Sequence, residues 1–259
     1  MMYSGIFDTH AHYDDEKFDD DRAQVLSSLK DGGVCGVIDC GCDLSSSLKA
    51  IELSEKYDFV YAAVGIHPHE TAEAGANDFD EIKKLFSKEK VVAVGEIGLD
   101  YHYDFSPREV QLTFFERQII LSKELDLPII VHDREAHEDT MNLLKKYKPK
   151  GVVHCFSGSA EMAKEVLKLG MYIGLGGAVT FKNARKPLEV AAIIPDDRLL
   201  LETDCPYMAP VPFRGSRCDS TMIAYTAQKL AEERGCEVQS LIDKCRVNAK
   251  ELFKLPQSI

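Results

Sequence analysis

Short, nearly continuous apolar runs alternate with amphipathic segments along most of the chain. Eight of the apolar runs are bounded by Gly, Pro or Asp, a pattern typical of strands that are buried on both faces. The predicted strands are residues 5–10, 35–41, 60–67, 91–97, 128–133, 151–156, 171–177 and 198–204. The segments between and after them have helical periodicity. The predicted helices are residues 21–33, 47–57, 80–89, 109–125, 137–148, 160–170, 222–235 and 238–253.

This alternation indicates an α/β protein. Eight strand–helix units predict a (β/α)₈ TIM barrel, and the last helical segment predicts an extra C-terminal helix. A doubly wound open sheet shows the same alternation and is the alternative. The count of eight favours the barrel, and no Gly-rich dinucleotide-binding turn follows the first strand. Because no domain boundary is visible, residues 1–259 are predicted to form a single domain.

The composition is that of an ordinary globular protein, with 45% hydrophobic and 29% charged residues. The N-terminus lacks the features of a secretory signal, and no apolar segment approaches the roughly 20 residues of a membrane helix. A cytoplasmic protein without membrane association is therefore predicted. The eight cysteines are then expected to be reduced thiols. Cys40 and Cys42 have no partner pair at zinc-finger spacing, so a structural zinc is not predicted there.

Polar residues stand at the carboxyl ends of the predicted strands. His10 and His12 end the first strand, and because alternate residues of a strand face the same side, both face the same way, with Cα atoms roughly 6.5 Å apart. In a barrel that end is the mouth, where barrel enzymes have their active sites. The residues at the same end of the other strands are His67, Glu96, His132, His154 and Asp204.

A single histidine at such a position is more often a core residue than a ligand. A whole cluster of desolvated imidazoles and carboxylates, however, is costly without a common partner, and metal ions are partners that suit these donors. In a closed barrel, Asp204 on strand eight lies beside His10 and His12 on strand one, whereas Glu96 lies near the fifth and sixth strands. No lysine stands near the end of strand four to serve as a carboxylated bridge, so Glu96 is predicted to bridge two divalent cations, roughly 3.5–4 Å apart.

Several sequence blocks resemble the signature blocks of the TatD family of metal-dependent hydrolases. The blocks are FDTHAH, GIHPHE, VGEIGLDY, PIIVHDREA, VVHCFSGS, IGLGGAVTFKNA, RLLLETDCPYMAP and, in the last helix, VNAKELF. They follow the order of the family and cover the chain from residue 5 to about 215, and the closing VNAKELF resembles the C-terminal helix of the family. LLLETDCPY and HCFSGS are highly specific, whereas H-x-H alone is not.

The resemblance implies a single hydrolase barrel with divalent-metal-dependent deoxyribonuclease activity, typically 3′→5′ exonuclease activity. The metal positions of the family fall on the residues that the strand ends also select, namely His10, His12, Glu96, His132, His154 and Asp204. Glu202 matches a further acidic position and is predicted to hold a ligand or a water. One loop departs from the family pattern, because Cys218-Asp219-Ser220 stands where Asn-Glu-Pro is expected. This departure bears on substrate preference rather than on the metal site.

The predicted reaction is hydrolysis of a phosphodiester by a metal-activated water. Asp204 is predicted to orient that water and accept its proton, with Glu202 as the second catalytic carboxylate. His67, Arg134 and Arg214 are predicted to contact substrate phosphates. The cations are Zn²⁺, Mg²⁺, Mn²⁺ or similar, because the donors do not distinguish between them.

The net charge of −12 repels long nucleic acid, so the predicted substrate is a short or single-stranded DNA end that enters a cationic mouth. No obligate protein partner is indicated. Two alternatives stay open at this point. One is a hydrolase of carboxylic esters or amides, such as an aminoacyl-tRNA deacylase. The other is a non-catalytic metal-binding barrel, against which the complete ligand set argues.

Overall fold

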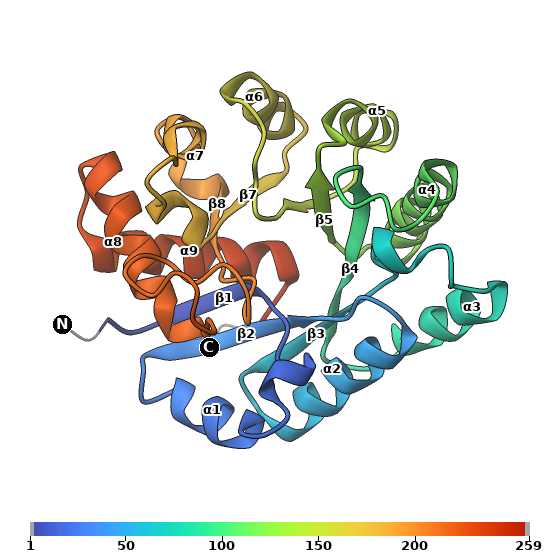
Figure 1. Cartoon of the computed structure of the whole chain (residues 1–259), viewed down its shortest axis with the longest axis horizontal. Helices are drawn as coiled ribbons and strands as arrows, with labels where there is room; N and C mark the ends of the chain where they lie inside the picture. Colours follow the sequence, from blue (N-terminus) through green and yellow to red (C-terminus); the bar gives the residue numbers. More distant parts are fainter. Residues whose placement is uncertain (1–2, 257–259) are drawn as a thin grey trace.

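The computed structural model describes residues 3–256, in which eight parallel strands form one sheet in chain order and the helices surround it (Figure 1). The strands are β1 (Ile6–Ala11), β2 (Val34–Cys40), β3 (Val60–Val64), β4 (Val91–Asp100), β5 (Ile129–Arg134), β6 (Gly151–Val153), β7 (Tyr172–Leu175) and β8 (Leu199–Leu201). The α-helices are α1 (Arg22–Leu29), α2 (Leu44–Lys56), α3 (Ala76–Leu85), α4 (Arg108–Leu125), α5 (His137–Tyr147), α6 (Ala160–Lys168), α7 (Arg185–Ala191), α8 (Ile223–Arg234) and α9 (Val238–Phe253). Short 3₁₀ helices are η1 (Glu16–Phe18), η2 (Pro68–Glu70), η3 (Gly177–Thr180), η4 (Asp196–Arg198) and η5 (Ser220–Met222).

The barrel is closed between β1 and β8, mostly just beyond the last residue of β8. The backbone N–H of Asp204 donates to His10 O at 2.9 Å, and that of His12 donates to Cys205 O at 2.7 Å. Ala11 and Cys205 form a parallel bridge. The predicted TIM barrel is thus confirmed, and the doubly wound sheet is excluded. Closure is made at the carboxyl end, where the polar side chains gather.

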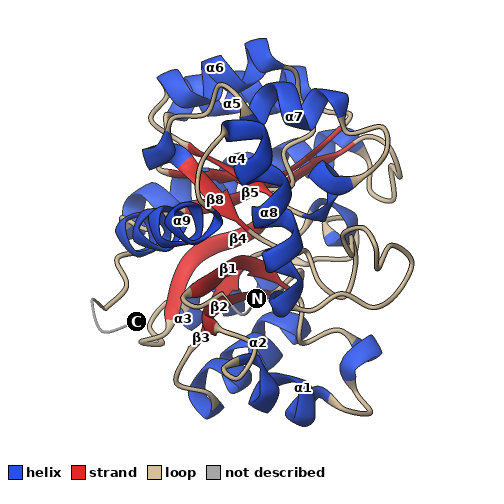
Figure 2. Ribbon diagram, turned by 90° about the vertical axis from the view of Figure 1, so that its left-hand side faces the viewer, coloured by secondary structure: helices blue, strands red, loops and turns tan. Residues whose placement is uncertain are grey.

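The opposite, amino-terminal end of the barrel is sealed by apolar side chains. Phe7 and Tyr61 belong to the same buried cluster as Leu252 and Phe253 of α9 and Leu255 just beyond it. The extra C-terminal helix is therefore confirmed, and it contacts β1 and β8 (Figure 2). Since this end is filled, the carboxyl end is the side on which a ligand can enter. None of the helices within residues 3–256 is long and apolar enough to cross a membrane.

Several strand and helix ends differ from the sequence prediction. β3 ends at Val64 and β6 at Val153, so His67 and His154 lie in the loops that follow these strands. β4 continues to Asp100, three residues past the predicted end at 97, because Gly98 and Asp100 still pair with β5. β8 ends at Leu201, so Asp204 lies in the turn after the strand. Helix α7 was not among the predicted helices, because it has only seven residues and contains Pro187, too little for a periodic pattern.

Glycine is required at position 98, where the backbone of β4 lies very close to that of β5. Its φ is +147°, and a Cβ atom built there would lie 1.9 Å from the carbonyl oxygen of His132. Gly98→Ala is expected to lower the free energy of unfolding by at least about 3 kcal/mol, measured by urea denaturation. Gly170→Ala is the control, because Gly170 also has a positive φ of +80° but no atom within 4 Å of the added methyl group. It is expected to cost about 1 kcal/mol, and equal losses in the two variants would contradict the steric explanation.

Candidate active site

Glu96 lies at the centre of a histidine cluster in the barrel mouth and is only 3% exposed. Its Oε2 atom lies 3.3 Å from His10 Nε2 and 3.5 Å from His12 Nε2. Its Oε1 atom lies 2.7 Å from His154 Nε2 and 2.9 Å from His132 Nδ1. Each carboxylate oxygen therefore faces a different pair of imidazoles, which is the arrangement that a bridging carboxylate requires.

Asp204 faces the same cluster from the turn after β8. Its Oδ1 atom lies 3.4 Å from His12 Nε2 and 3.6 Å from His10 Nε2. Its φ of +62° is in the left-handed region, which aspartate tolerates better than most residues. The turn is held by the N–H of Tyr207, which donates to Asp204 O at 2.9 Å. The side chain is 23% exposed, so Asp204 presents a carboxylate to the open side of the cluster.

The side chains form three overlapping groups, and within each group the ligand atoms lie no more than 4.8 Å from one another. The groups are His10–His12–Glu96, His10–His154–Asp204 and His67–Glu96–His132. All six residues predicted as metal ligands are thus brought together. His67 also joins them, with Nε2 3.6 Å from Glu96 Oε1. Its predicted role in phosphate contact stays a prediction, since it lies among the candidate ligands.

The electrostatics of the cluster suit divalent cations. Burial would raise the pKa of Glu96, but His154 and the other imidazoles outweigh it, and the pKa lies well below its usual range. Burial would also raise the pKa of Asp204, but the hydrogen bond with His12 and the nearby imidazoles outweigh burial and lower this pKa. Burial, with repulsion from His154, lowers the pKa of His10 to about 4. Neighbouring acidic groups outweigh burial and raise the pKa values of His12, His132 and His154, so cations that bind here must displace protons from these imidazoles. The imidazole and carboxylate donors suit divalent cations without selecting one of them.

Glu202 touches His154 from the side opposite Glu96. Its Oε1 atom accepts a hydrogen bond from the Cys155 N–H and lies 4.0 Å from His154 Nδ1. Within residues 3–256, His154 Nδ1 and Glu202 Oε2 have no hydrogen-bond partner. Burial raises the pKa of Glu202 to about 7. At 4.0 Å the carboxylate makes no hydrogen bond with the imidazole, so the role predicted for Glu202 in holding a ligand or a water stays a prediction.

Asp100 is a site residue that the sequence reasoning missed. Its Oδ2 atom lies 3.0 Å from His132 Nε2 and 3.0 Å from His69 Nε2. Its Oδ1 atom accepts the N–H groups of His102 and Tyr103 at 3.0 and 2.9 Å. Asp100 therefore fixes the His132 ring, whose other nitrogen faces Glu96. The available signal was its spacing, four residues after Glu96 on the extended β4.

Asp8 is a second missed residue, and it supports the backbone on both sides of the barrel closure. Its Oδ1 atom accepts the N–H groups of His10 and Thr203 at 3.2 and 3.0 Å. Its Oδ2 atom accepts the hydroxyl of Ser220 at 2.7 Å, and the Ser220 hydroxyl also lies 2.8 Å from the Tyr13 hydroxyl. The loop that departs from the family pattern is therefore attached to the strand that carries His10.

The cluster opens into a cavity of about 650 Å³ at the barrel mouth. Arg134, one of the predicted phosphate contacts, lines this cavity with its guanidinium 4.9 Å from the centre of the Tyr103 ring. Arg214 does not line it and lies instead in a neighbouring depression. Tyr207 and Met208 belong to the walls of both. The structure thus brings His67 and Arg134 to the cluster but places Arg214 further away.

Comparisons with known proteins agree with this geometry. A family model described as "TatD related DNase" matches residues 7–254. The metal-dependent hydrolase YabD of Bacillus subtilis is 45% identical over 253 residues, covering 96% of this chain and 99% of YabD. The 3′-5′ ssDNA/RNA exonuclease TatD of Pantoea ananatis is 34% identical over 259 residues, covering 96% of this chain and 100% of that enzyme. Among solved structures, the TatD homolog YJJV of Escherichia coli has a TM-score of 0.92 at 32% identity, covering 99% of this chain and 100% of YJJV.

Proposed function

The chain belongs to the family of TatD-related DNases and is a metal-dependent hydrolase of ester bonds, and from this premise we propose that it is a 3′→5′ exonuclease acting on the ends of single-stranded DNA. The observation that carries the proposal is the position of Glu96, with one oxygen toward each histidine pair. The name of the P. ananatis relative, a 3′-5′ ssDNA/RNA exonuclease, supports the substrate class.

Two divalent cations are proposed, one for each of the two histidine pairs that the oxygens of Glu96 face. His10, His12 and Asp204 would hold one cation, His132 and His154 would hold the other, and Glu96 would be shared between them. Such ions lower the pKa of a water to near neutrality and neutralise the charge that builds up on a reacting phosphate.

The protein's own groups position the reactants. Asp204 is the most exposed of the proposed ligands and accepts the proton of the attacking water, because its carboxylate faces the cavity and is ionised. Glu202 and Asp100 act as positioning residues for His154 and His132. Arg134 donates to a substrate phosphate from the cavity wall.

The size of the mouth and the net charge of the chain favour a chain end over a duplex. With a net charge of −12, the surface as a whole repels a long polyanion. A terminal nucleotide needs to enter only the cavity of about 650 Å³. We therefore infer an enzyme that shortens strands rather than one that cuts within them.

The test uses purified protein whose bound metal has first been measured. A single-stranded DNA oligonucleotide labelled at its 5′ end is expected to shorten stepwise in Mg²⁺ or Mn²⁺, and one labelled at its 3′ end is expected to release labelled mononucleotide first. EDTA should stop the reaction, and excess Mg²⁺ or Mn²⁺ should restore it. Aminoacyl esters are assayed in parallel. Acyl cleavage without any nucleotide release would contradict the proposed function and favour a deacylase.

A further inference from the structure

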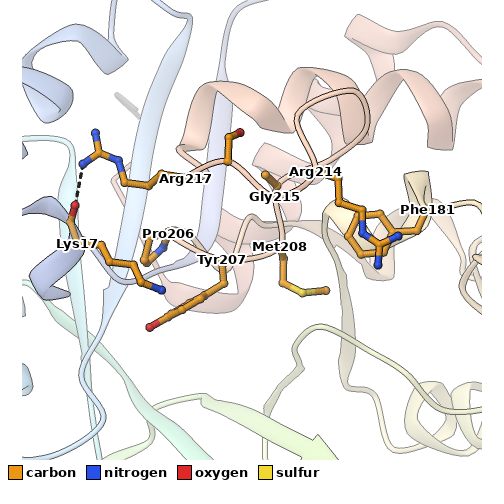
Figure 3. A pocket seen from close by; sticks show the side chains of 10 residues that line it. Lys17, Phe181, Pro206, Tyr207, Met208, Arg214, Gly215 and Arg217 are labelled. Atoms are coloured by element: carbon orange, nitrogen blue, oxygen red, sulfur yellow. Dashed lines mark hydrogen bonds between the residues drawn. The ribbon is translucent and has the colours of Figure 1, made fainter.

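Beside the candidate active site is a second depression, which we call the side pocket and define by Lys17, Phe181, Tyr207, Arg214 and Arg217. It has a volume of about 650 Å³ and is built by the loops that follow β1, β7 and β8 (Figure 3). Tyr207 forms part of the wall shared with the catalytic cavity. Since one turn joins Tyr207 to Asp204, the side pocket begins immediately beside the cluster.

The side pocket is cationic in an acidic protein. Three basic residues line it, and its lining contains no carboxylate, although the chain carries a net charge of −12. The Lys17 ammonium lies 3.9 Å from the centre of the Tyr207 ring, and the Arg214 guanidinium lies 4.3 Å from that of Phe181. Among the described residues 3–256, neither Lys17 nor Arg214 has an acidic side chain within ion-pair distance. Their charges are therefore available to a ligand.

Arg217 stabilises the loop after β8 through its own hydrogen bonds. Its guanidinium donates to Asp21 at 2.6 Å. It also donates to the Lys17 carbonyl at 2.7 Å, the hydrogen bond drawn in Figure 3. The next residue, Cys218, is buried, and its N–H donates to Pro206 O at 3.0 Å. The pocket wall is thus already held in place before any ligand binds. A preformed site binds more tightly than one that must first be ordered.

A cation lying on an aromatic face keeps its outward N–H groups free to donate to an anion. We propose that the side pocket binds a backbone phosphate of the substrate strand, next to the phosphodiester that is cleaved, through Lys17 and Arg214. This inference rests on the proposed function and deepens it, since it explains how an acidic enzyme retains a strand during successive cleavages. It also gives Arg214 a role in binding the strand, away from the cluster where the reaction takes place.

The test measures binding separately from cleavage. Asp204→Asn protein in Mg²⁺ is titrated with a fluorescent hexathymidylate, and the dissociation constant is measured between about 50 and 200 mM salt. Adding Arg214→Gln or Lys17→Gln is expected to weaken hexanucleotide binding about tenfold. Each is also expected to make the slope of log K against log salt shallower by about 0.7, the value for one lost phosphate contact on a single strand.

Two shorter ligands locate the phosphate. A dithymidylate without terminal phosphates contains only the scissile phosphodiester. Its dissociation constant, measured by competition with the hexanucleotide, should therefore change less than about twofold in either variant. Free 5′-thymidylate should be equally insensitive. If both variants weaken binding of the dinucleotide as much as binding of the hexanucleotide, the side pocket does not hold an adjacent strand phosphate. The same conclusion follows if only binding of the mononucleotide is weakened.

Two further variants control for charge and fold. Arg198→Gln removes another arginine that lies over an aromatic ring, 5.1 Å from the centre of Tyr172, but at the amino-terminal end of the barrel. It should leave hexanucleotide binding unchanged. Arg214→Lys should recover most of the salt slope. An unchanged slope in Arg214→Gln protein, with nuclease activity present in the parent, would overturn the side-pocket proposal alone. Absence of nucleotide release together with a shallower slope would overturn only the proposed exonuclease activity.

Discussion

Replacing Glu96 with Gln is expected to lower kcat/KM for a single-stranded oligonucleotide by at least about 10³-fold, equivalent to about 4 kcal/mol of transition-state stabilisation. The reason is the division of its two oxygens between different histidine pairs. Glutamine has the same shape, yet whichever way its amide turns, an NH₂ group replaces one of the two metal-binding oxygens. The bound metal should therefore fall along with the activity, which metal analysis of the purified variant measures.

Glu202→Gln is the matched comparison for Glu96→Gln, because it makes the same substitution at another buried glutamate of the same rim. Glu202 touches His154 from behind instead of facing the candidate ligand groups directly. Its loss should therefore cost only about 10–100-fold in activity or metal affinity. If Glu96→Gln kept its full metal content and lost less activity than Glu202→Gln, Glu96 would not be the bridge.

Asp204→Asn is expected to lower kcat by about 10²–10⁴-fold while KM changes little. Asparagine keeps the turn after β8 because it also tolerates the left-handed region, and φ of Asp204 is +62°. It lacks the negative charge that accepts a proton from water. Single-turnover assays with the end-labelled oligonucleotide separate this chemical step from product release.

Asp15→Asn is the control for Asp204→Asn. Asp15 lines the same cavity and accepts the Tyr207 hydroxyl at 2.8 Å, but it belongs to none of the candidate ligand groups. The rate of this variant should stay close to that of the parent. If Asp204→Asn hydrolysed DNA at the parental rate after contaminating nucleases were excluded, Asp204 would not be the proton acceptor.

The barrel, and the clustering of polar side chains at its mouth, could be predicted from sequence because both depend on simple periodicities. Strands buried on both faces read as apolar runs, and a polar residue that ends such a run lies at the mouth of a barrel. His10, Glu96 and Asp204 are far apart in sequence, yet barrel topology alone brings them together. Their roles in binding metal and in catalysis stay predictions that the variants above test.

Residues whose partners come from irregular segments could not be predicted in the same way. Asp8 lies within a strand, but its function depends on Ser220, in a loop without any periodic pattern. Asp100 was missed because Gly98 resembles the end of a strand, although the ladder to β5 continues past it. Arg214 was correctly judged to lie past strand eight, but the path of the loop decides which depression it enters.

The apolar seal formed by Leu252, Phe253 and Leu255 affects how the protein folds during translation. These residues emerge from the ribosome after all eight strands have been synthesised. They nevertheless pack with Phe7, which lies near the start of β1. The nascent barrel therefore exposes the apolar side chains of its floor until residue 255 is released. Apolar surface exposed in this way during synthesis favours aggregation, so the last step of barrel assembly is the release of the C-terminal helix.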